Sequence, residues 1–227
     1  MIDPQQVQEG SMLMIDKPFR WTSFDVVKKL RGALGVKKIG HAGTLDPLAT
    51  GLLILCTGKL TKELNNYQAL EKEYVGTLIL GKTTPSIDLE TDFDSHQDTS
   101  HLTKKQIVSA TNKFVGSIQQ VPPSYSAIKV DGQRVYNKAR RGQKVELPPR
   151  TVEITQFQIT HCTIPEVKFK VICSKGTYIR SLVRDFGAYL NTGAYLSSLV
   201  RTRIGPYLLS KAYTLEELLE TLPSGIK

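Results

Sequence analysis

A single carboxylate occupies a glycine-rich stretch of the sequence. Asp46 lies in GHAGTLDPLATG (residues 40–51), among threonines and small apolar residues, with His41 five positions upstream. Such a carboxylate can act as a nucleophile when a nearby cation keeps it ionised and orients it. The alternative is structural, because aspartate is a common turn residue and the following proline restricts the loop. The stretch contains neither the second carboxylate of a glycosidase pair nor a GxxxxGK[ST] phosphate loop.

Arg180 is a candidate for the cation that this nucleophile needs. It lies in CSKGTYIRSLVRD, near the start of an expected helix and off the apolar stripe formed by Ile179, Leu182 and Val183. The alternative is a solvated arginine that pairs with neighbours on its own helix. Arg180 and Asp46 are far apart in the sequence, so both interpretations stay open at this point.

The charge balance favours a polyanionic partner. The 227 residues include 30 Lys and Arg against 21 Asp and Glu, which gives a net charge of +9 and a pI near 9.4. Such an excess indicates nucleic acid first and anionic lipid second, with a merely basic protein as the alternative. The chain is long enough for one substantial core, and its apolar and charged fractions are typical of a globular protein.

Cysteine and histidine usage excludes several classes of protein. Cys56, Cys162 and Cys173 are odd in number and have no CxxC spacing, which disfavours a disulfide framework and fits a reducing compartment. No cluster has zinc-ligand spacing, so we expect no metal site. No apolar run approaches the ~18 residues of a membrane span, and MIDPQQVQEG lacks the pattern of a signal peptide. A cytoplasmic protein is therefore expected.

Apolar periodicity predicts an α+β fold with a mixed, mostly antiparallel sheet flanked by helices. In SFDVVKKLRGALG, a helix is expected with Ser23 as its N-cap and Gly35 after its last turn. Capping-box spacing predicts two further helices that begin at Thr103 and Thr214. Another helix is expected in TYIRSLVRDFGAYL. The stretch KTTPSIDLETDFDSHQDTSH is a polar loop. Strands are expected in SMLMIDKP, GLLILCTG, KEYVGTLILG, VEITQFQITHC, EVKFKVICSKG and AYLSSLVRTRIG.

Residues 122–150 differ in composition from their surroundings. Two Pro-Pro pairs bracket this segment, basic residues far outnumber acidic ones in it, and Asp131-Gly132 predicts a hairpin turn. Such a segment is more typical of an excursion from the core than of the core itself. Its cations that can reach phosphates are Lys129, Arg134, Lys138, Arg140, Arg141 and Lys144.

Several motifs, taken in order, carry a family resemblance. GHAGTLDPLATGLL resembles the signature of the TruB-type tRNA pseudouridine-55 synthases. DKP…TS, KEYVGTLILG and CSKGTYIRSLVRDFG resemble further motifs of that family, and LVRTRIG resembles the segment that bears its pocket leucine. VPPSYSAIKVDGQRVYNKARRG is similar to the RNA-binding insertion, or thumb. The resemblance extends along nearly the whole chain and implies a pseudouridine synthase fold acting on the T-loop of tRNA.

The resemblance also implies roles for three catalytic residues. Asp46 would be the nucleophile, acting either at C6 of the base or at the sugar, where it would attack C1′ or remove a ribose proton. Arg180 would keep Asp46 ionised through a bidentate contact. Tyr74 would stack on the base and lie where a proton is abstracted late in the reaction. No metal and no organic cofactor are implied.

Further residues are implied to bind the flipped-out uridine. Leu199 and Tyr178 would close the pocket, and His41 would fill the vacated stack, with a loop histidine bonded to the backbone as its alternative. The complete implied set of substrate-binding residues is Lys17, His41, Gly43, Thr44, Tyr178 and Leu199.

The chain departs from the family pattern at several positions. The family usually has glycine at the position of Arg20, and often has two arginines where this chain has Val200 and Arg201. Thr91 follows DLE where glycine is usual. These departures bear on RNA contact rather than on the reaction. Residues 1–227 are expected to form a single catalytic domain without an appended PUA module.

Two other classes of function compete with the enzyme. A non-catalytic tRNA-binding or tRNA-folding protein would keep the basic surface, but binding alone needs no nucleophile, so the joint presence of Asp46, Tyr74 and Arg180 disfavours it. A phosphate- or sugar-handling enzyme would need a phosphate loop, paired carboxylates or a metal cluster, and none of these is evident in the sequence. The expected protein is therefore a monomeric tRNA-modifying isomerase.

Overall fold

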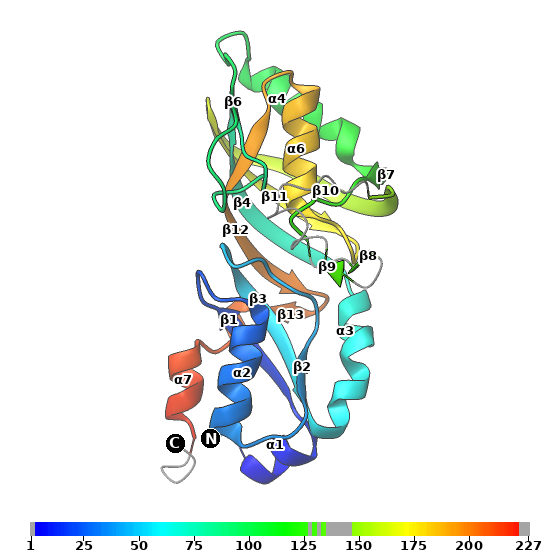
Figure 1. Cartoon of the computed structure of the whole chain (residues 1–227). Helices are drawn as coiled ribbons and strands as arrows, with labels where there is room; N and C mark the ends of the chain where they lie inside the picture. The colour runs from blue at the N-terminus through cyan, green and yellow to red at the C-terminus, as the bar shows by residue number, and fades with distance from the viewer. Residues whose placement is uncertain (1–2, 127–128, 131–132, 135–146, 223–227) are drawn as a thin grey trace. The chain divides into compact units, whose positions relative to one another are not determined.

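A computed structural model of the chain describes residues 3–126, 129–130, 133–134 and 147–222. The chain divides into two compact units (Figure 1). Unit 1 comprises Met1–Val75 and Leu199–Lys227, and unit 2 comprises Gly76–Ser198. Two strands, β4 (Lys72–Leu80) and β12 (Ala194–Ile204), contribute residues to both units. Among the described residues, no helix is long and apolar enough to cross a membrane.

Unit 1 is built on a mixed sheet. Besides its parts of β4 and β12, its elements are α1 (Pro4–Gly10), β1 (Met12–Lys17), α2 (Ser23–Leu34), β2 (Ile39–His41), β3 (Ala49–Thr57), the 3-10 helix η1 (Gly58–Glu63), α3 (Leu64–Ala69), β13 (Tyr207–Leu208), the 3-10 helix η3 (Leu209–Lys211) and α7 (Leu215–Glu220). The strand order is β1–β3–β12–β4, with β2 added to β3 and β13 added to β12. β3 runs antiparallel to β1 and parallel to β12, so the expected mixed sheet is confirmed.

The central strand β3 has a continuous apolar run at residues 52–56, and elements on both of its faces cover this run. Leu53 and Leu55 belong to the buried cluster that α2 and α7 complete. Leu52 and Ile54 point to the opposite face, where residues of η1 and α3 pack on them. Successive side chains of a strand alternate between faces, so a doubly covered strand reads as a continuous apolar run.

The helix expected after WTS is α2, but its N-cap is Thr22 rather than Ser23. Thr22 Oγ1 accepts a hydrogen bond from the Asp25 amide at 3.0 Å, and the Asp25 carboxylate accepts one from the Thr22 amide at 2.8 Å. This capping box needs a side-chain acceptor three residues after the cap. Thr22 has Asp25 there, whereas Ser23 has Val26. Gly35 ends the helix as expected, with a φ of 63° in the left-handed region.

Two segments of unit 1 form helices that the sequence pattern does not predict. α1 begins after the N-cap Asp3 and buries Val7, and η1 continues into α3 after β3. Neither α1 nor α3 exceeds seven residues. Such short helices show too few repeats of the apolar period to stand out, and their stability comes from tertiary packing.

Unit 2 contains an antiparallel sheet covered by helices. Besides its parts of β4 and β12, its elements are β5 (Lys82–Thr83), β6 (Ser95–His96), α4 (Lys104–Ala110), the 3-10 helix η2 (Thr111–Phe114), β7 (Gly116–Gln120), β8 (Lys129–Val130), β9 (Gln133–Arg134), β10 (Arg150–Thr163), β11 (Glu166–Cys173) and α6 (Ile179–Tyr189). The order is β12–β4–β11–β10–β7, and β10 is antiparallel to both of its neighbours. Phe186 of α6 packs edge-to-face on Phe157 of β10, with ring centroids 5.2 Å apart. The stretch expected as a polar loop contains the short β5–β6 pair.

Arg20 adopts a left-handed backbone conformation, with a φ of 66°. This conformation costs a residue with a Cβ roughly 1–2 kcal/mol, whereas glycine adopts it freely. We therefore expect Arg20→Gly to raise the free energy of unfolding by about 0.5–1 kcal/mol, after the added chain entropy of glycine is subtracted. Urea denaturation measures the change. Arg20→Ala, which keeps the Cβ, is the matched control, and a glycine variant no more stable than the alanine variant would contradict the expectation.

Candidate functional site

The Asp46 loop, defined here as residues 42–48, lies in unit 1 between β2 and β3. These strands form an antiparallel pair in which His41 is opposite Leu55. The Ala42 amide donates to the Ile54 carbonyl at 2.8 Å, and the Ala49 amide donates to the Asp46 carbonyl at 3.1 Å. The loop is thereby anchored to β3 at both ends, and Asp46 itself is half-buried.

Three side chains hold the Asp46 loop from different elements. The Ser23 hydroxyl, at the start of α2, accepts from the Leu45 amide at 2.9 Å and lies 3.3 Å from the Leu45 carbonyl. Lys17 Nζ, at the end of β1, donates to the Pro47 carbonyl at 3.4 Å. Arg201 Nη2, on β12, donates to the Gly43 carbonyl at 3.1 Å. The sequence did not reveal the roles of Ser23 and Arg201, because each depends on contact with a distant segment.

Lys17 is fully buried, and it is surrounded by backbone carbonyls. Its Nζ also donates to Pro18 O at 2.9 Å and to Trp21 O at 2.5 Å. Burial lowers the pKa of Lys17 to about 8, while the negative charge of Asp46 acts in the opposite direction. Unit 1 therefore contains a cation that interacts electrostatically with Asp46. Contact between Lys17 and a substrate stays a prediction.

His41 lies at the end of β2, next to the Asp46 loop. Burial lowers its pKa, the charge of Arg201 lowers it further, and the Gly43 backbone acts in the opposite direction. Among the described residues, no hydrogen-bond partner of good geometry meets its buried Nδ1. The lowered pKa favours the neutral imidazole over the charged form. Insertion of His41 into a base stack stays a prediction.

The predicted pocket residues of unit 1 lie on neighbouring strands. Leu199 begins the part of β12 that belongs to unit 1 and pairs with Ala49, three residues after Asp46. Tyr74 lies on β4, which follows β12 in the strand order. Leu199 and Tyr74 are buried, whereas Thr44 is exposed on the loop.

Arg180 lies in unit 2, in the first turn of α6, and is 3% exposed. Its Nη1 donates to the Ser86 carbonyl at 3.0 Å, its Nη2 donates to the Tyr125 carbonyl at 2.7 Å, and its Nε lies 3.7 Å from a carboxylate oxygen of Asp88. The alternative of a solvated arginine is therefore wrong. A pairing between Arg180 and Asp46 stays a prediction, since the two residues belong to different units.

Tyr178 precedes α6 and is positioned by two contacts within unit 2. Its backbone amide donates to the Gln120 side-chain oxygen at 2.8 Å, and the Gln120 amide group donates back to its carbonyl at 3.1 Å. The Arg150 guanidinium lies 4.3 Å from the Tyr178 ring centroid. The Tyr178 side chain is half-buried, and its role in closing the pocket stays a prediction.

Only part of the predicted thumb is described. β8 and β9 pair antiparallel, with Val130 opposite Gln133, as the expected hairpin requires. The turn residues Asp131 and Gly132 lie outside the described residues. Of the six predicted phosphate-binding cations, Lys129 and Arg134 lie on these strands, and those outside the described residues are Lys138, Arg140, Arg141 and Lys144.

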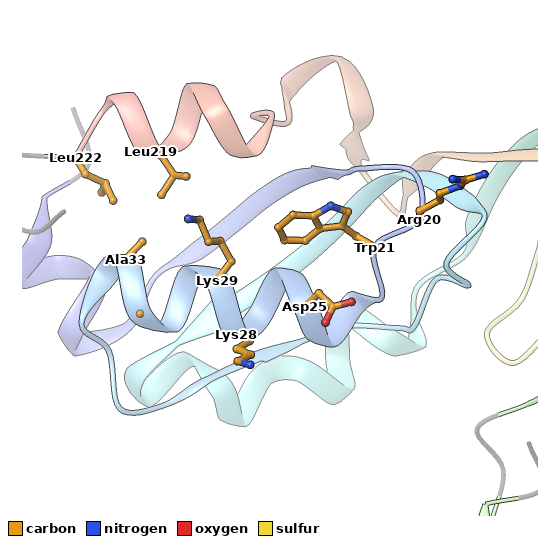
Figure 2. A pocket seen from close by; sticks show the side chains of 9 residues that line it. Arg20, Trp21, Asp25, Lys28, Lys29, Ala33, Leu219 and Leu222 are labelled. Carbon is orange, nitrogen blue, oxygen red and sulfur yellow. The ribbon is translucent and has the colours of Figure 1, made fainter. Parts of the chain in front are cut away.

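Unit 1 also has an open pocket of about 960 Å³ beside α2 and α7. In Figure 2, the Trp21 ring and Lys29 lie between the two helices, with Leu219 on α7, Leu222 just after the end of α7, and Arg20 at one end. Its lining residues include one carboxylate and no histidine, cysteine or serine, so we place no chemistry there. No group of three or more potential metal ligands occurs within the described part of the chain.

Comparison with known proteins identifies two family models. One, described as the N-terminal domain of TruB family pseudouridylate synthase, matches residues 31–179, and another, the tRNA pseudouridylate synthase B C-terminal domain, matches residues 180–223. A Phocaeicola vulgatus protein named tRNA pseudouridine synthase B is 51% identical over 95% of this chain and 94% of its own length. A Streptomyces avermitilis protein of the same name is 42% identical over 98% of this chain and 76% of its own.

Solved structures with the same fold come from larger proteins. A chain in a crystal structure of a Cbf5-Nop10-Gar1 complex aligns with a TM-score of 0.75 and 29% identity, over 95% of this chain. A chain in an H/ACA RNP bound to a substrate RNA containing 2′-deoxyuridine aligns with a TM-score of 0.71 and 27% identity. The present chain spans 55% and 54% of the lengths of those two chains.

Proposed function

This chain belongs to the TruB family of pseudouridylate synthases, and from that membership we propose that it isomerises uridine-55 to pseudouridine in the T-loop of tRNA. The observation that carries the proposal is the fixed carboxylate loop. Asp46 is half-buried on a loop that three side chains and two strands hold in place. Lys17 and Arg201 bond backbone carbonyls of this loop, and the charge of Asp46 acts on Lys17.

The reaction breaks the N1–C1′ bond of the nucleotide, rotates the uracil and joins C5 to C1′. The base then loses the proton at C5 and gains one at N1, so no atom is added overall. Asp46 acts as the nucleophile, either at C6 of the base or at the sugar. The target uridine must first leave the stacked loop, at a cost of a few kcal/mol, and we propose that His41 occupies the vacated place.

The residues proposed to take part in the reaction lie in both units. Unit 1 supplies Asp46, Tyr74 and Leu199, and unit 2 supplies Arg180 and Tyr178. The Tyr74 ring and the Leu199 side chain are the apolar groups against which we propose that the uracil stacks. The excess positive charge of the chain favours the tRNA backbone, and the predicted thumb cations are its proposed contacts.

We expect Tyr74→Phe to retain tRNA binding and base stacking but to lower the isomerisation rate by about a hundredfold. The ring that stacks is unchanged, whereas the hydroxyl that takes part in the late proton transfer is gone. Single-turnover assays at saturating enzyme separate the rate from binding. Tyr195→Phe, at another buried tyrosine, is the matched control. A normal rate in Tyr74→Phe would assign the proton transfer to another group.

The proposed function is tested by incubating unmodified tRNA transcript with the protein and mapping pseudouridine at each nucleotide. We expect modification at position 55 and none in a transcript with cytidine there. Modification at several other uridines instead would contradict the proposed site. A transcript that stays unmodified while still bound would favour a binding protein.

We also propose that the chain acts as a monomer in the cytoplasm. The three cysteines are free thiols, and Cys56 and Cys173 are buried, which fits a reducing compartment. Sedimentation analysis with and without tRNA tests the oligomeric state, and a stable dimer in the absence of RNA would contradict the proposal.

A further inference from the structure

Arg201 is a buried cation on the strand next to the Asp46 loop. It is 1% exposed, in the part of β12 that pairs parallel with β3, where it is opposite Gly51. A side chain at position 51 would come within 2.4 Å of the Arg201 carbonyl oxygen, so glycine is required for this close approach. The close packing of the two strands sets the Arg201 side chain beneath the loop that precedes β3.

The guanidinium of Arg201 joins three segments of unit 1. Its Nε donates to the Leu52 carbonyl at 2.7 Å, and its Nη2 donates to the Gly43 carbonyl at 3.1 Å. A Cβ on Gly43 would lie 3.6 Å from Nη1, so the guanidinium packs directly against the loop backbone. A planar group with several fixed donors can hold two carbonyls at once, which an ammonium does less well.

Arg201 cannot contact RNA because its side chain is buried. The departure from the family pattern at Val200 and Arg201 bears on RNA contact, but a guanidinium that is this deeply buried cannot reach a phosphate. Arg203, two residues along the same strand, differs because its side chain is partly exposed and it pairs with Glu71 at 2.8 Å. The two arginines therefore have different tasks.

We propose that Arg201 is a positioning residue that fixes the Gly43 end of the Asp46 loop on β3, opposite the Pro47 end fixed by Lys17. This inference rests on the proposed function, in which Asp46 must meet one atom of the substrate. A shift of about 1 Å in a reacting group can cost a hundredfold in rate. Two buried side chains that hold the loop on either side of Asp46 restrict such a shift.

The test compares Arg201→Lys and Arg201→Gln with Arg203→Lys and Arg203→Gln. We expect both Arg201 variants to lower the single-turnover rate at saturating enzyme by about tenfold to a hundredfold, with the glutamine variant slower. Affinity for tRNA should stay within about threefold of the parent protein, because Arg201 reaches no phosphate. The Arg203 variants should retain the parent rate.

Hydrogen exchange gives a readout that needs no activity. The Leu45 and Ala42 amides, bonded to Ser23 and Ile54, should exchange faster in the Arg201 variants, whereas the Leu182 amide of α6 should not change. Folded Arg201 variants with the parent rate and unchanged exchange would overturn the proposal. The proposal would also be overturned if the Arg201 variants lost only tRNA affinity, or if neither variant folded at low temperature. An inactive parent protein would instead refute the proposed function. Hydrogen exchange would then still test whether Arg201 holds the Asp46 loop.

Discussion

Asp46→Asn is expected to lower the rate of pseudouridine formation by about a thousandfold or more while tRNA affinity stays within about threefold. The amide has the shape of the carboxylate but is a poor nucleophile. The backbone of the loop should persist, since its contacts to Ser23 and Arg201 involve other residues of the loop. Single-turnover assays and filter binding measure the rate and the affinity separately.

The same substitution should also lower stability, because of Lys17. The charge of Asp46 raises the pKa of this buried lysine, so removing that charge leaves a buried cation with less compensation. Assays must therefore run well below the melting temperature of the variant. Asp92→Asn, at an exposed carboxylate of unit 2, is the control. Activity of Asp46→Asn within tenfold of the parent protein would remove Asp46 from the role of nucleophile.

Arg180→Lys is expected to lower both the rate and the stability. The buried guanidinium donates to the carbonyls of Ser86 and Tyr125 and lies near Asp88, and one ammonium cannot serve all three positions. An unsatisfied buried carbonyl costs about 1–3 kcal/mol, so we expect the free energy of unfolding to fall by that amount. The rate should fall by about a hundredfold or more if Arg180 orients Asp46 by a two-point contact.

Arg184→Lys is the matched control for Arg180→Lys. Arg184 lies one turn further along α6, is partly exposed, and donates to the Val121 carbonyl at 3.0 Å. We expect this variant to differ little from the parent protein, because solvent can replace the lost contact. If Arg180→Lys is destabilised but keeps the parent rate at low temperature, Arg180 supports unit 2 and takes no part in the reaction.

The sequence alone predicted the features that depend on neighbouring residues. The strands of GLLILCTG and KEYVGTLILG, the capping boxes at Thr103 and Thr214 and the αL glycine at position 35 all appear in the structure. Periodicity and capping are local, so a single segment contains the whole signal. The N-cap of α2 was misplaced by one residue because two adjacent hydroxyl residues compete for it.

Only the tertiary structure decided how the Asp46 loop is held. Lys17, Ser23 and Arg201 come from β1, α2 and β12, and each reaches a different backbone group of the loop. The sequence indicated other roles for them, with Lys17 as a substrate-binding residue and Ser23 as a helix cap, because nothing in their neighbourhoods indicates that they hold a distant loop. The burial of Arg180 among carbonyls is of the same kind, since its partners lie 55 and 94 residues away. Such buried charges are stabilised by groups that folding brings together. Local sequence patterns do not show which distant residues will meet.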